Sequence, residues 1–283
     1  MPVCSLHVLA LHTSIPSFLS VLASQSPPIK PLLASKPLRW IVRPTSTSTS
    51  LLGSNATTQD PNPPSNPWDL VIVLPLDVPL PVAAIPFIAQ QFSVTVGVPS
   101  SRLKQLAEGN DQLLHPPGGV PQSSGERTRG ANASSSQSLE LSNPLQQWIA
   151  KEGNGDTRGG AVSMLNLLSF NKGKKTSYQQ YGAAFASKVG NRHGGNAKIV
   201  GTVISINGSN EKNRSDTEGG MEWDEIAIAH YPSLTHFADM ISSKDYQEVN
   251  QKHRLGALRD TFILCTSELR VEEELKKAGA ARL

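Results

Sequence analysis

Residues 160–269 hold four apolar stretches of strand length, separated by helix-like stretches in one order, and this order restricts the folds that the chain can adopt. The strand-like stretches are rich in β-branched and aliphatic residues and span residues 160–170, 197–206, 223–231 and 261–269. Aromatic and apolar residues recur at helical spacing between the first two, from residue 177 to residue 189. Between the last two, Ser233 is a suitable N-cap for a helical stretch over 234–241, and Ser242 and Ser243 restart a helix that runs to about residue 258. The predicted order is therefore β-α-β-β-α-β.

This order predicts a four-stranded antiparallel sheet with both helices on one face, the ferredoxin-like arrangement. The other face of such a sheet is apolar and needs a second sheet to cover it. Two such sheets packed face to face form an α+β barrel, and this is the fold class that we predict.

The N-terminal half shows the same order in a weaker pattern. Its strand-like stretches span residues 6–11, 38–43, 68–74 and 93–98, and its helical stretches span 15–22, capped by Ser14, and 81–91. A Trp-Asp pair opens the third strand of each half, at Trp68-Asp69 and at Trp223-Asp224. The same pair at the same place favours two repeats in one chain. The alternative is one C-terminal domain behind an irregular extension.

These patterns divide the chain into four parts. We expect an N-terminal ferredoxin-like repeat over residues 1–114 with a Ser-, Thr- and Pro-rich loop at 44–67, a low-complexity flexible linker at 115–138, a C-terminal ferredoxin-like repeat over 139–271, and a charged tail at 272–283. One short helix, 143–151, is predicted at the start of the third part, with Ser142 as its N-cap.

Composition excludes several classes of protein. A net charge of +3 is too small to indicate a nucleic-acid partner. No run reaches the roughly 18 apolar residues of a membrane span, so we expect no membrane partner. Cys4 and Cys265 lie in apolar runs and are expected to be buried free thiols in a reducing compartment. The apolar stretch 8–22 is not preceded by the basic residues that begin a signal peptide. We therefore expect a cytoplasmic protein, with secretion as the alternative.

Four stretches of the C-terminal half carry a resemblance to a known family: Tyr178-Gln179-Gln180-Tyr181, His193-Gly194-Gly195, His230-Tyr231-Pro232-Ser233, and Ser243-Lys244-Asp245-Tyr246 with Arg254 and Arg259 beyond it. Over roughly residues 160–270 the chain resembles the DUF1330 family of the dimeric α+β-barrel superfamily. The whole chain also looks like a two-repeat group of fungal proteins of unknown function. The resemblance implies the barrel, usually as a homodimer of single-repeat chains, and no established reaction. The position matched to His230 is often acidic in the family, so any role of that acid does not carry over.

Enzymes of this superfamily work in the barrel, often without a cofactor, in apolar pockets with a few polar groups. Polar residues inside predicted apolar elements are therefore our catalytic candidates. The Asn166 amide can hold a carbonyl or enolate oxygen, and His230, at a strand end, can act as a general base. Glu225 alternates with Ile226 and Ile228, so it faces away from them. The alternatives are an asparagine bonded to backbone, a strand-end histidine without a role, and an acid on the far face of the sheet.

Six further residues are candidates for substrate binding: Tyr181, Arg192, His193, Tyr246, His253 and Arg254. Arg192 and His193 can bind an anion together, and Tyr246 and His253 project from one helix face because they are seven residues apart. Core packing for Tyr181, and helix packing or a solvated face for the others, are the alternatives. No nucleotide-binding loop, zinc motif or nucleophile elbow occurs, and no histidines have ligand spacing beside an acid, so we expect no cofactor and no metal.

Together these observations predict a protein that binds or transforms a small hydrophobic molecule in the pocket of the C-terminal half of the barrel, without a cofactor. The alternative is a non-enzymatic module for assembly or ligand binding, and catalysis is left open. Because both halves of the barrel lie in one chain, we expect a monomer.

Overall fold

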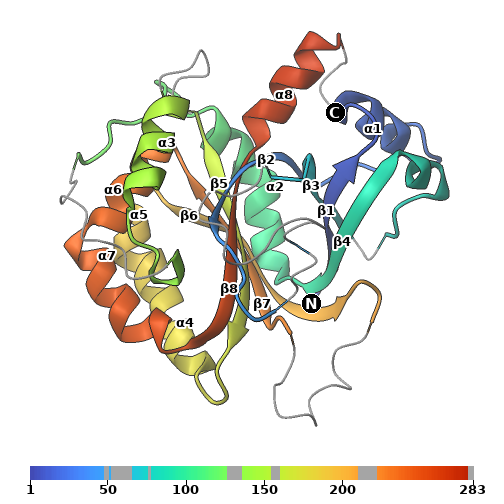
Figure 1. Cartoon of the computed structure of the whole chain (residues 1–283). Helices are drawn as coiled ribbons and strands as arrows, with labels where there is room; N and C mark the ends of the chain where they lie inside the picture. Colours follow the sequence, from blue (N-terminus) through green and yellow to red (C-terminus); the bar gives the residue numbers. More distant parts are fainter. Residues whose placement is uncertain are drawn as a thin grey trace.

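Eight antiparallel strands close into a barrel in the order β1-β3-β2-β8-β5-β7-β6-β4 (Figure 1). The computed structural model describes residues 1–47, 51, 66–75, 78–125, 136–153, 160–209 and 222–279. The strands are β1 (Val3–Leu11), β2 (Leu33–Val42), β3 (Leu70–Pro75), β4 (Ile88–Gly97), β5 (Val162–Phe170), β6 (Asn196–Ile206), β7 (Glu225–Tyr231) and β8 (Leu258–Ser267).

The helices cover the outer surface of this barrel. The α-helices are α1 (Ile15–Ala23), α2 (Ser100–Leu114), α3 (Asn143–Gly153), α4 (Lys175–Ala184), α5 (Gly190–Arg192), α6 (Leu234–Ser242), α7 (Lys244–Val249) and α8 (Glu268–Lys277). Short 3-10 helices, η2 (Val82–Phe87) and η3 (Ser136–Ser138), and π-helical segments, η4 (Phe185–Val189) and η6 (Asn250–Leu255), complete the set in the described part of the chain.

Each half of the chain forms one four-stranded sheet. The N-terminal sheet has the order β4-β1-β3-β2, and the C-terminal sheet has the order β8-β5-β7-β6. The pairs β2–β8 and β4–β6 join the two sheets edge to edge. The predicted α+β barrel is confirmed, and both sheets have the ferredoxin-like strand order.

The two sheets also share their register. His7 of β1 pairs with Ile72 of β3, and Asn166 of β5 pairs with Ala227 of β7. At a distance of two residues along the strands from these pairs, Leu74 lies opposite Ser5 and Ala229 lies opposite Met164. Residues of one half can therefore be compared with their counterparts in the other.

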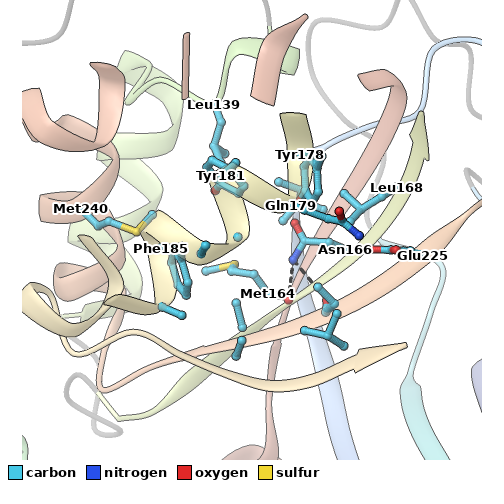
Figure 2. Close-up of a pocket in the computed structure, with 18 of the residues that line it drawn as sticks. Leu139, Met164, Asn166, Leu168, Tyr178, Gln179, Tyr181, Phe185, Glu225 and Met240 are labelled. Carbon is cyan, nitrogen blue, oxygen red and sulfur yellow. Dashed lines mark hydrogen bonds between the residues drawn. The ribbon is translucent and has the colours of Figure 1, made fainter. Parts of the chain in front are cut away.

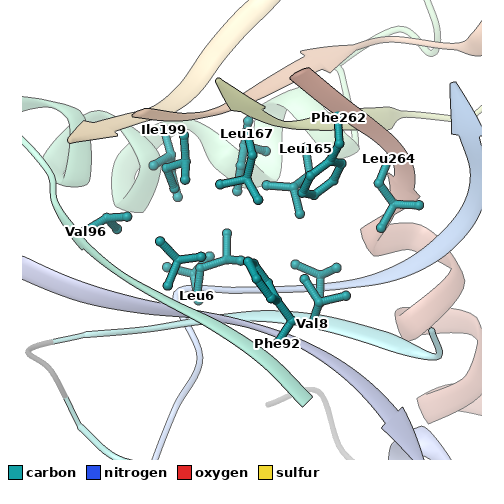
Figure 3. Close-up of a cluster of buried hydrophobic side chains, with 14 of the residues drawn as sticks. Leu6, Val8, Phe92, Val96, Leu165, Leu167, Ile199, Phe262 and Leu264 are labelled. Atoms are coloured by element: carbon teal, nitrogen blue, oxygen red, sulfur yellow. The ribbon is translucent and has the colours of Figure 1, made fainter. Parts of the chain in front are cut away.

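The barrel interior is filled with aliphatic and aromatic side chains from both sheets (Figure 3). The labelled members are Leu6, Val8, Phe92, Val96, Leu165, Leu167, Ile199, Phe262 and Leu264. Trp68 and Trp223, each the residue before the aspartate of its Trp-Asp pair, are 3% and 0% exposed in the same cluster. Burial of such side chains contributes about 1.5–3 kcal/mol each. The interior is therefore a core, and space for a ligand must lie outside it.

The outer face of each sheet packs against helices. On the N-terminal sheet, Phe18 and Leu22 of α1 and Val271 of α8 contact the strands. On the C-terminal sheet, helices α3, α6 and α7 and the π-helical segment η4 complete a second layer. Helix α8 follows β8 but packs on β2 of the other half, and α2 follows β4 but packs on β6. Each half therefore contributes one helix that packs on the sheet of the other half.

Several predicted elements differ from the structure. Residues 81–91 do not form one helix, because Pro86 lies within the short helix η2 and strand β4 begins at Ile88. Helix α2 has no counterpart among the predictions. Helix α8, with Ser267 as its N-cap, extends into the predicted charged tail and ends at Lys277. The predicted N-caps Ser14 and Ser233 are confirmed, since each side chain accepts a backbone N–H of the first helical turn. Of the two serines expected to restart a helix, Ser243 is the N-cap of α7.

The two connecting segments are described only in part. Residues 126–135 of the predicted linker and most of the loop 44–67 lie outside the described residues. At the end of the described linker, the Gly125 N–H donates to Asp239 Oδ2 at 2.7 Å, so this part of the segment is fixed to α6. Cys4 and Cys265 are fully buried and form no disulfide, as predicted. Within the described ranges, every helix is too short or too polar to cross a membrane.

Candidate functional site

A cavity of about 400 Å³ lies between the outer face of the C-terminal sheet and helix α4 (Figure 2). Strands β5 and β7 form its floor, and α4 with η4 forms its roof. Its lining includes Met164, Asn166, Leu168, Tyr178, Tyr181, Phe185, Glu225, Ala227, Ala229 and Tyr231, with Arg102 from α2. The cavity therefore lies outside the barrel wall, whereas the pocket was expected in the barrel.

Two alanines explain why this space is empty. Ala227 and Ala229 form part of the floor, and their counterparts in the N-terminal sheet are Ile72 and Leu74. Both counterparts are fully buried, in the cluster that includes Phe18 of α1. Helix α4 has no buried residue, whereas α1 has four. Small floor residues and a helix that inserts no side chain deeply leave the C-terminal cavity open.

Asn166 presents a hydrogen-bond acceptor to the cavity. Its Nδ2 donates to the carbonyl oxygens of Met164, at 2.8 Å, and Ala227, at 3.3 Å (Figure 2). Because carbonyl oxygens only accept, these bonds fix which end of the amide carries the N–H groups. The predicted use of this N–H on a substrate carbonyl is wrong, since the backbone occupies it. The Oδ1 atom is left to receive an O–H or N–H of a ligand.

Glu225 lies on the same face of the sheet as Asn166. It lines the cavity, its side chain is 14% exposed, and its carboxylate pairs with Lys175 Nζ at 2.7 Å. The prediction that Glu225 faces away from Ile226 and Ile228 is confirmed, because both isoleucines point into the barrel core. The structure therefore brings Asn166 and Glu225 together.

Tyrosines form an aromatic wall of the cavity. The rings of Tyr178 and Tyr181 are 5.2 Å apart, and Tyr181 Oη lies 3.4 Å from Tyr246 Oη behind it. Burial raises the pKa of Tyr178, Tyr231 and Tyr246 above the ordinary phenol value. These phenols stay neutral, so they can exchange hydrogen bonds with a ligand without acting as charged groups.

Arg254 and Tyr246 support this wall from outside the cavity. Arg254 is 2% exposed, and its Nη1 donates to the Gln137 carbonyl at 3.0 Å and to Asn250 Oδ1 at 3.3 Å. Its positive charge opposes the effect of burial on the pKa of the neighbouring tyrosines. Tyr246 and Arg254 were both predicted to bind substrate. Neither lines the cavity, and each instead supports the tyrosines of the wall.

His230 lies on the opposite face of the sheet from Asn166. Tyr231 lines the cavity, and side chains alternate along a strand, so His230 points the other way, with Ile226 and Ile228. It is 1% exposed, and burial, followed by the charges of Lys198 and His236, lowers its pKa to about 3. The structure therefore does not bring His230 together with Asn166.

The other predicted binding residues also lie away from the cavity. Arg192 Nη1 is 3.4 Å from Asp245 Oδ2, and the buried His193 has its Nδ1 3.3 Å from Ser124 Oγ. His253 lies in η6, where its carbonyl accepts the Ser177 hydroxyl at 3.2 Å. Of the predicted site residues, the cavity therefore contains Asn166, Glu225 and Tyr181.

Sequence reasoning missed Arg102 and the floor alanines. Arg102 reaches the cavity from α2, and its Nη1 donates to the Ala197 carbonyl at 3.3 Å. Its position depends on how α2 crosses to the other half, which no local pattern encodes. Ala227 and Ala229 alternate in a strand where larger residues are usual, and this was a usable signal. No cluster of three or more His, Cys, Asp or Glu side chains suited to a metal ion occurs in the part of the chain that the structure describes.

No family model matches the chain, and no curated protein matches it. Two solved structures resemble part of it. The crystal structure of RPA0582, a protein of unknown function from Rhodopseudomonas palustris, is 24% identical, covers 45% of this chain and 93% of that chain, and gives a TM-score of 0.34. The crystal structure of the methylated RPA0582 protein is 23% identical, covers 46% of this chain and 93% of that chain, and gives a TM-score of 0.35.

Proposed function

We propose that the cavity above β5 and β7 binds one small, mostly apolar molecule that carries a hydroxyl or N–H group. The observation that supports this proposal most directly is the cavity volume of about 400 Å³, which falls within the range of about 300–1,000 Å³ typical of small-molecule sites. Its floor is apolar except for Asn166 and Glu225, and Glu225 is paired with Lys175, so the Asn166 Oδ1 atom is the natural partner of the ligand donor. Buried acceptors favour ligands that satisfy them.

Binding is a better-supported function than catalysis. Among the described lining residues, Glu225 is the one acid, and its ion pair with Lys175 neutralises it. His230, the predicted base, faces the barrel core. We therefore propose a ligand-binding protein that needs no cofactor, and we keep catalysis by this cavity as the second possibility only if Glu225 leaves Lys175 when the ligand is bound.

The family relationship and the oligomeric state belong to the same proposal. The matching registers of the two sheets support an internal duplication and kinship with the two-repeat relatives of the DUF1330 family. Because each sheet already covers the apolar face of the other, the chain needs no second copy to close its barrel. We propose that it is a monomer.

Isothermal titration calorimetry with 2-naphthol tests the binding function. The variant Ala227→Ile/Ala229→Leu installs volume comparable to that of the N-terminal counterparts Ile72 and Leu74. We expect affinity to fall by about tenfold or more, because ligand and side chains compete for one space. Gln180→Ala, an exposed change on α4 outside the lining, is the matched control and should bind as the wild type does. Equal affinity in the filled variant and the wild type would overturn the proposal.

A further inference from the structure

A second site lies on the outer face of the N-terminal sheet, in the half of the molecule without the cavity described above. It is a groove of about 510 Å³, and its polar lining consists of Ser5, His7, Gln91, Ser93, Thr95 and Asn207. Leu80 and the 57% exposed Ile85 give it an apolar rim. His7 is the counterpart of Asn166, since each pairs with the equivalent residue of the third strand of its half. Both halves therefore place a polar side chain at the same position beside a hollow.

A chain of hydrogen bonds fixes the tautomer of His7. The Val78 carbonyl only accepts, so the Ser5 hydroxyl donates to it, at 3.4 Å. The Ser5 oxygen is then free to accept the Nε2–H of His7, at 3.1 Å. With its proton on Nε2, the imidazole offers the lone pair of Nδ1. The Ser93 hydroxyl, at 2.7 Å, donates to that lone pair.

The surroundings of Ser93 resemble those of an activated nucleophile. A serine within hydrogen-bond reach of a histidine, with that histidine oriented by a third group, is the arrangement that activates a hydroxyl. The Gln91 side-chain amide donates to Ser93 Oγ at 2.6 Å. The Asn207 side chain accepts the Ser93 backbone N–H at 2.9 Å, which holds a second amide beside the same residue.

The protonation state of His7 suits this role. His7 is 5% exposed, and burial lowers its pKa to about 4, so the ring is neutral near neutral pH and its Nδ1 carries an unprotonated lone pair. Among the described residues that line the groove, none is charged, so the ring faces serine hydroxyls and amides alone. The same lack of charge, with the apolar rim, favours an uncharged ligand.

We propose that Ser93 is a nucleophile activated by His7, and that the groove accepts small uncharged carboxylic esters. Ser93 Oγ bonds to the ester carbonyl carbon while its proton passes to His7 Nδ1. The bond to the leaving alkoxide breaks, and the alkoxide takes that proton and departs as an alcohol. Water then releases the carboxylic acid from Ser93 by the same transfer through His7. The Gln91 and Asn207 amides are the donors for the oxyanion, and Ser5 is a positioning residue.

Labelling with a biotinylated fluorophosphonate tests this inference on the full chain. We expect one adduct, located on the peptide that contains Ser93, and none in Ser93→Ala. His7→Gln should slow labelling by about 100-fold, since the general base is lost. Ser101→Ala, which removes an exposed serine on α2 outside the groove, is the matched control and should be labelled at the wild-type rate.

Far-UV circular dichroism and the melting temperature identify variants that fail to fold, and Ser5→Ala is the milder second variant, expected to slow labelling without abolishing it. An unlabelled, folded wild-type chain would overturn the inference. So would labelling of Ser93 at an unchanged rate in folded His7→Gln. The Ala227→Ile/Ala229→Leu variant should be labelled as the wild type is, so failure here is distinct from failure of the proposed ligand cavity.

Discussion

Asp69 and Asp224 make the same hydrogen bond in the two halves of the barrel. Asp69 Oδ2 accepts the backbone N–H of Leu11 at 2.8 Å, and Asp224 Oδ2 accepts that of Phe170 at 2.7 Å. Leu11 and Phe170 are the last residues of β1 and β5. Each aspartate therefore joins the start of the third strand to the end of the first, where strand pairing stops.

Equivalent bonds should have similar effects on stability. We expect Asp69→Ala and Asp224→Ala each to lower the free energy of unfolding by about 1–3 kcal/mol, because a partly buried N–H loses its partner. Asparagine keeps an acceptor, so Asp69→Asn and Asp224→Asn should cost less. Urea unfolding measures these differences, with the exposed Asp111→Ala as the control. A large effect at one aspartate and none at the other would show that the two positions are not equivalent.

Asn166 should select ligands that carry a hydrogen-bond donor. We expect Asn166→Ala to weaken binding of 2-naphthol by about five- to tenfold, since one hydrogen bond contributes about 1 kcal/mol. Binding of 2-methoxynaphthalene, which has no donor, should change far less. Calorimetric titration of both compounds into both proteins measures this selectivity. An equal loss of affinity for the two compounds would mean that Asn166 contributes only to the shape of the cavity.

His230 should make the fold sensitive to acid. Its pKa is about 3 in the folded chain and near 6.5 when unfolded, so the unfolded chain binds more protons between these values. Stability should therefore fall as pH drops from about 6.5 toward about 3, by about 1.4 kcal/mol per pH unit for this group. The charges of Lys198 and His236 act on it in the same direction as burial.

Chemical denaturation over this pH range compares the wild type with His230→Gln. The variant should lose stability less steeply, because glutamine does not titrate. The exposed His12→Gln should follow the wild-type slope. The same slope in His230→Gln and the wild type would contradict this assignment. His7 adds a similar dependence between about 6.5 and about 4, which remains in both proteins.

Lys198 and Glu268 form a buried ion pair that joins β6 to the start of α8. Lys198 Nζ lies 2.6 Å from Glu268 Oε1, and the Lys198 side chain is fully buried. Asn110 of α2 donates to Glu268 Oε2 at 2.8 Å, so three elements meet here. Glu268→Gln should lower stability by about 3–5 kcal/mol, because it leaves a buried charge without its partner.

The double variant Lys198→Met/Glu268→Leu separates the effect of the ion pair on stability from the effect of filling these two positions. It should recover most of the stability lost in Glu268→Gln, since an apolar pair of similar volume carries no desolvation penalty. Thermal and urea unfolding measure the recovery, and the exposed pair Lys104–Glu108 offers a control in which Glu108→Gln changes little. A double variant less stable than Glu268→Gln would contradict this account of the pair.

Local signals predicted most of the fold. The caps Ser14, Ser233 and Ser243 and the two Trp-Asp pairs act within a few residues, so the sequence displays them directly. Helix α2 was missed because its one buried residue, Leu106, gives almost no periodicity and its packing partner belongs to the other half. Contacts between distant segments leave no such local signal.

The candidate site was predicted in part for a related reason. Asn166 and Glu225 stand out as polar residues in apolar strands, and alternation along β7 correctly separates Glu225 from Ile226. Alternation does not tell which face lines a cavity, because both faces of these strands are buried, one by the barrel core and one by helices. His230 was therefore grouped with residues on the other side of its own sheet.

Native mass spectrometry of the wild type and of Ala227→Ile/Ala229→Leu, both purified from the natural host, tests the ligand cavity most directly. The account predicts a monomer of 30.3 kDa that carries one small-molecule adduct in the wild type and none in the filled variant. A wild-type chain that stays bare, or the same adduct at the same occupancy in both proteins, would contradict the claim that the space above Ala227 and Ala229 is a ligand site.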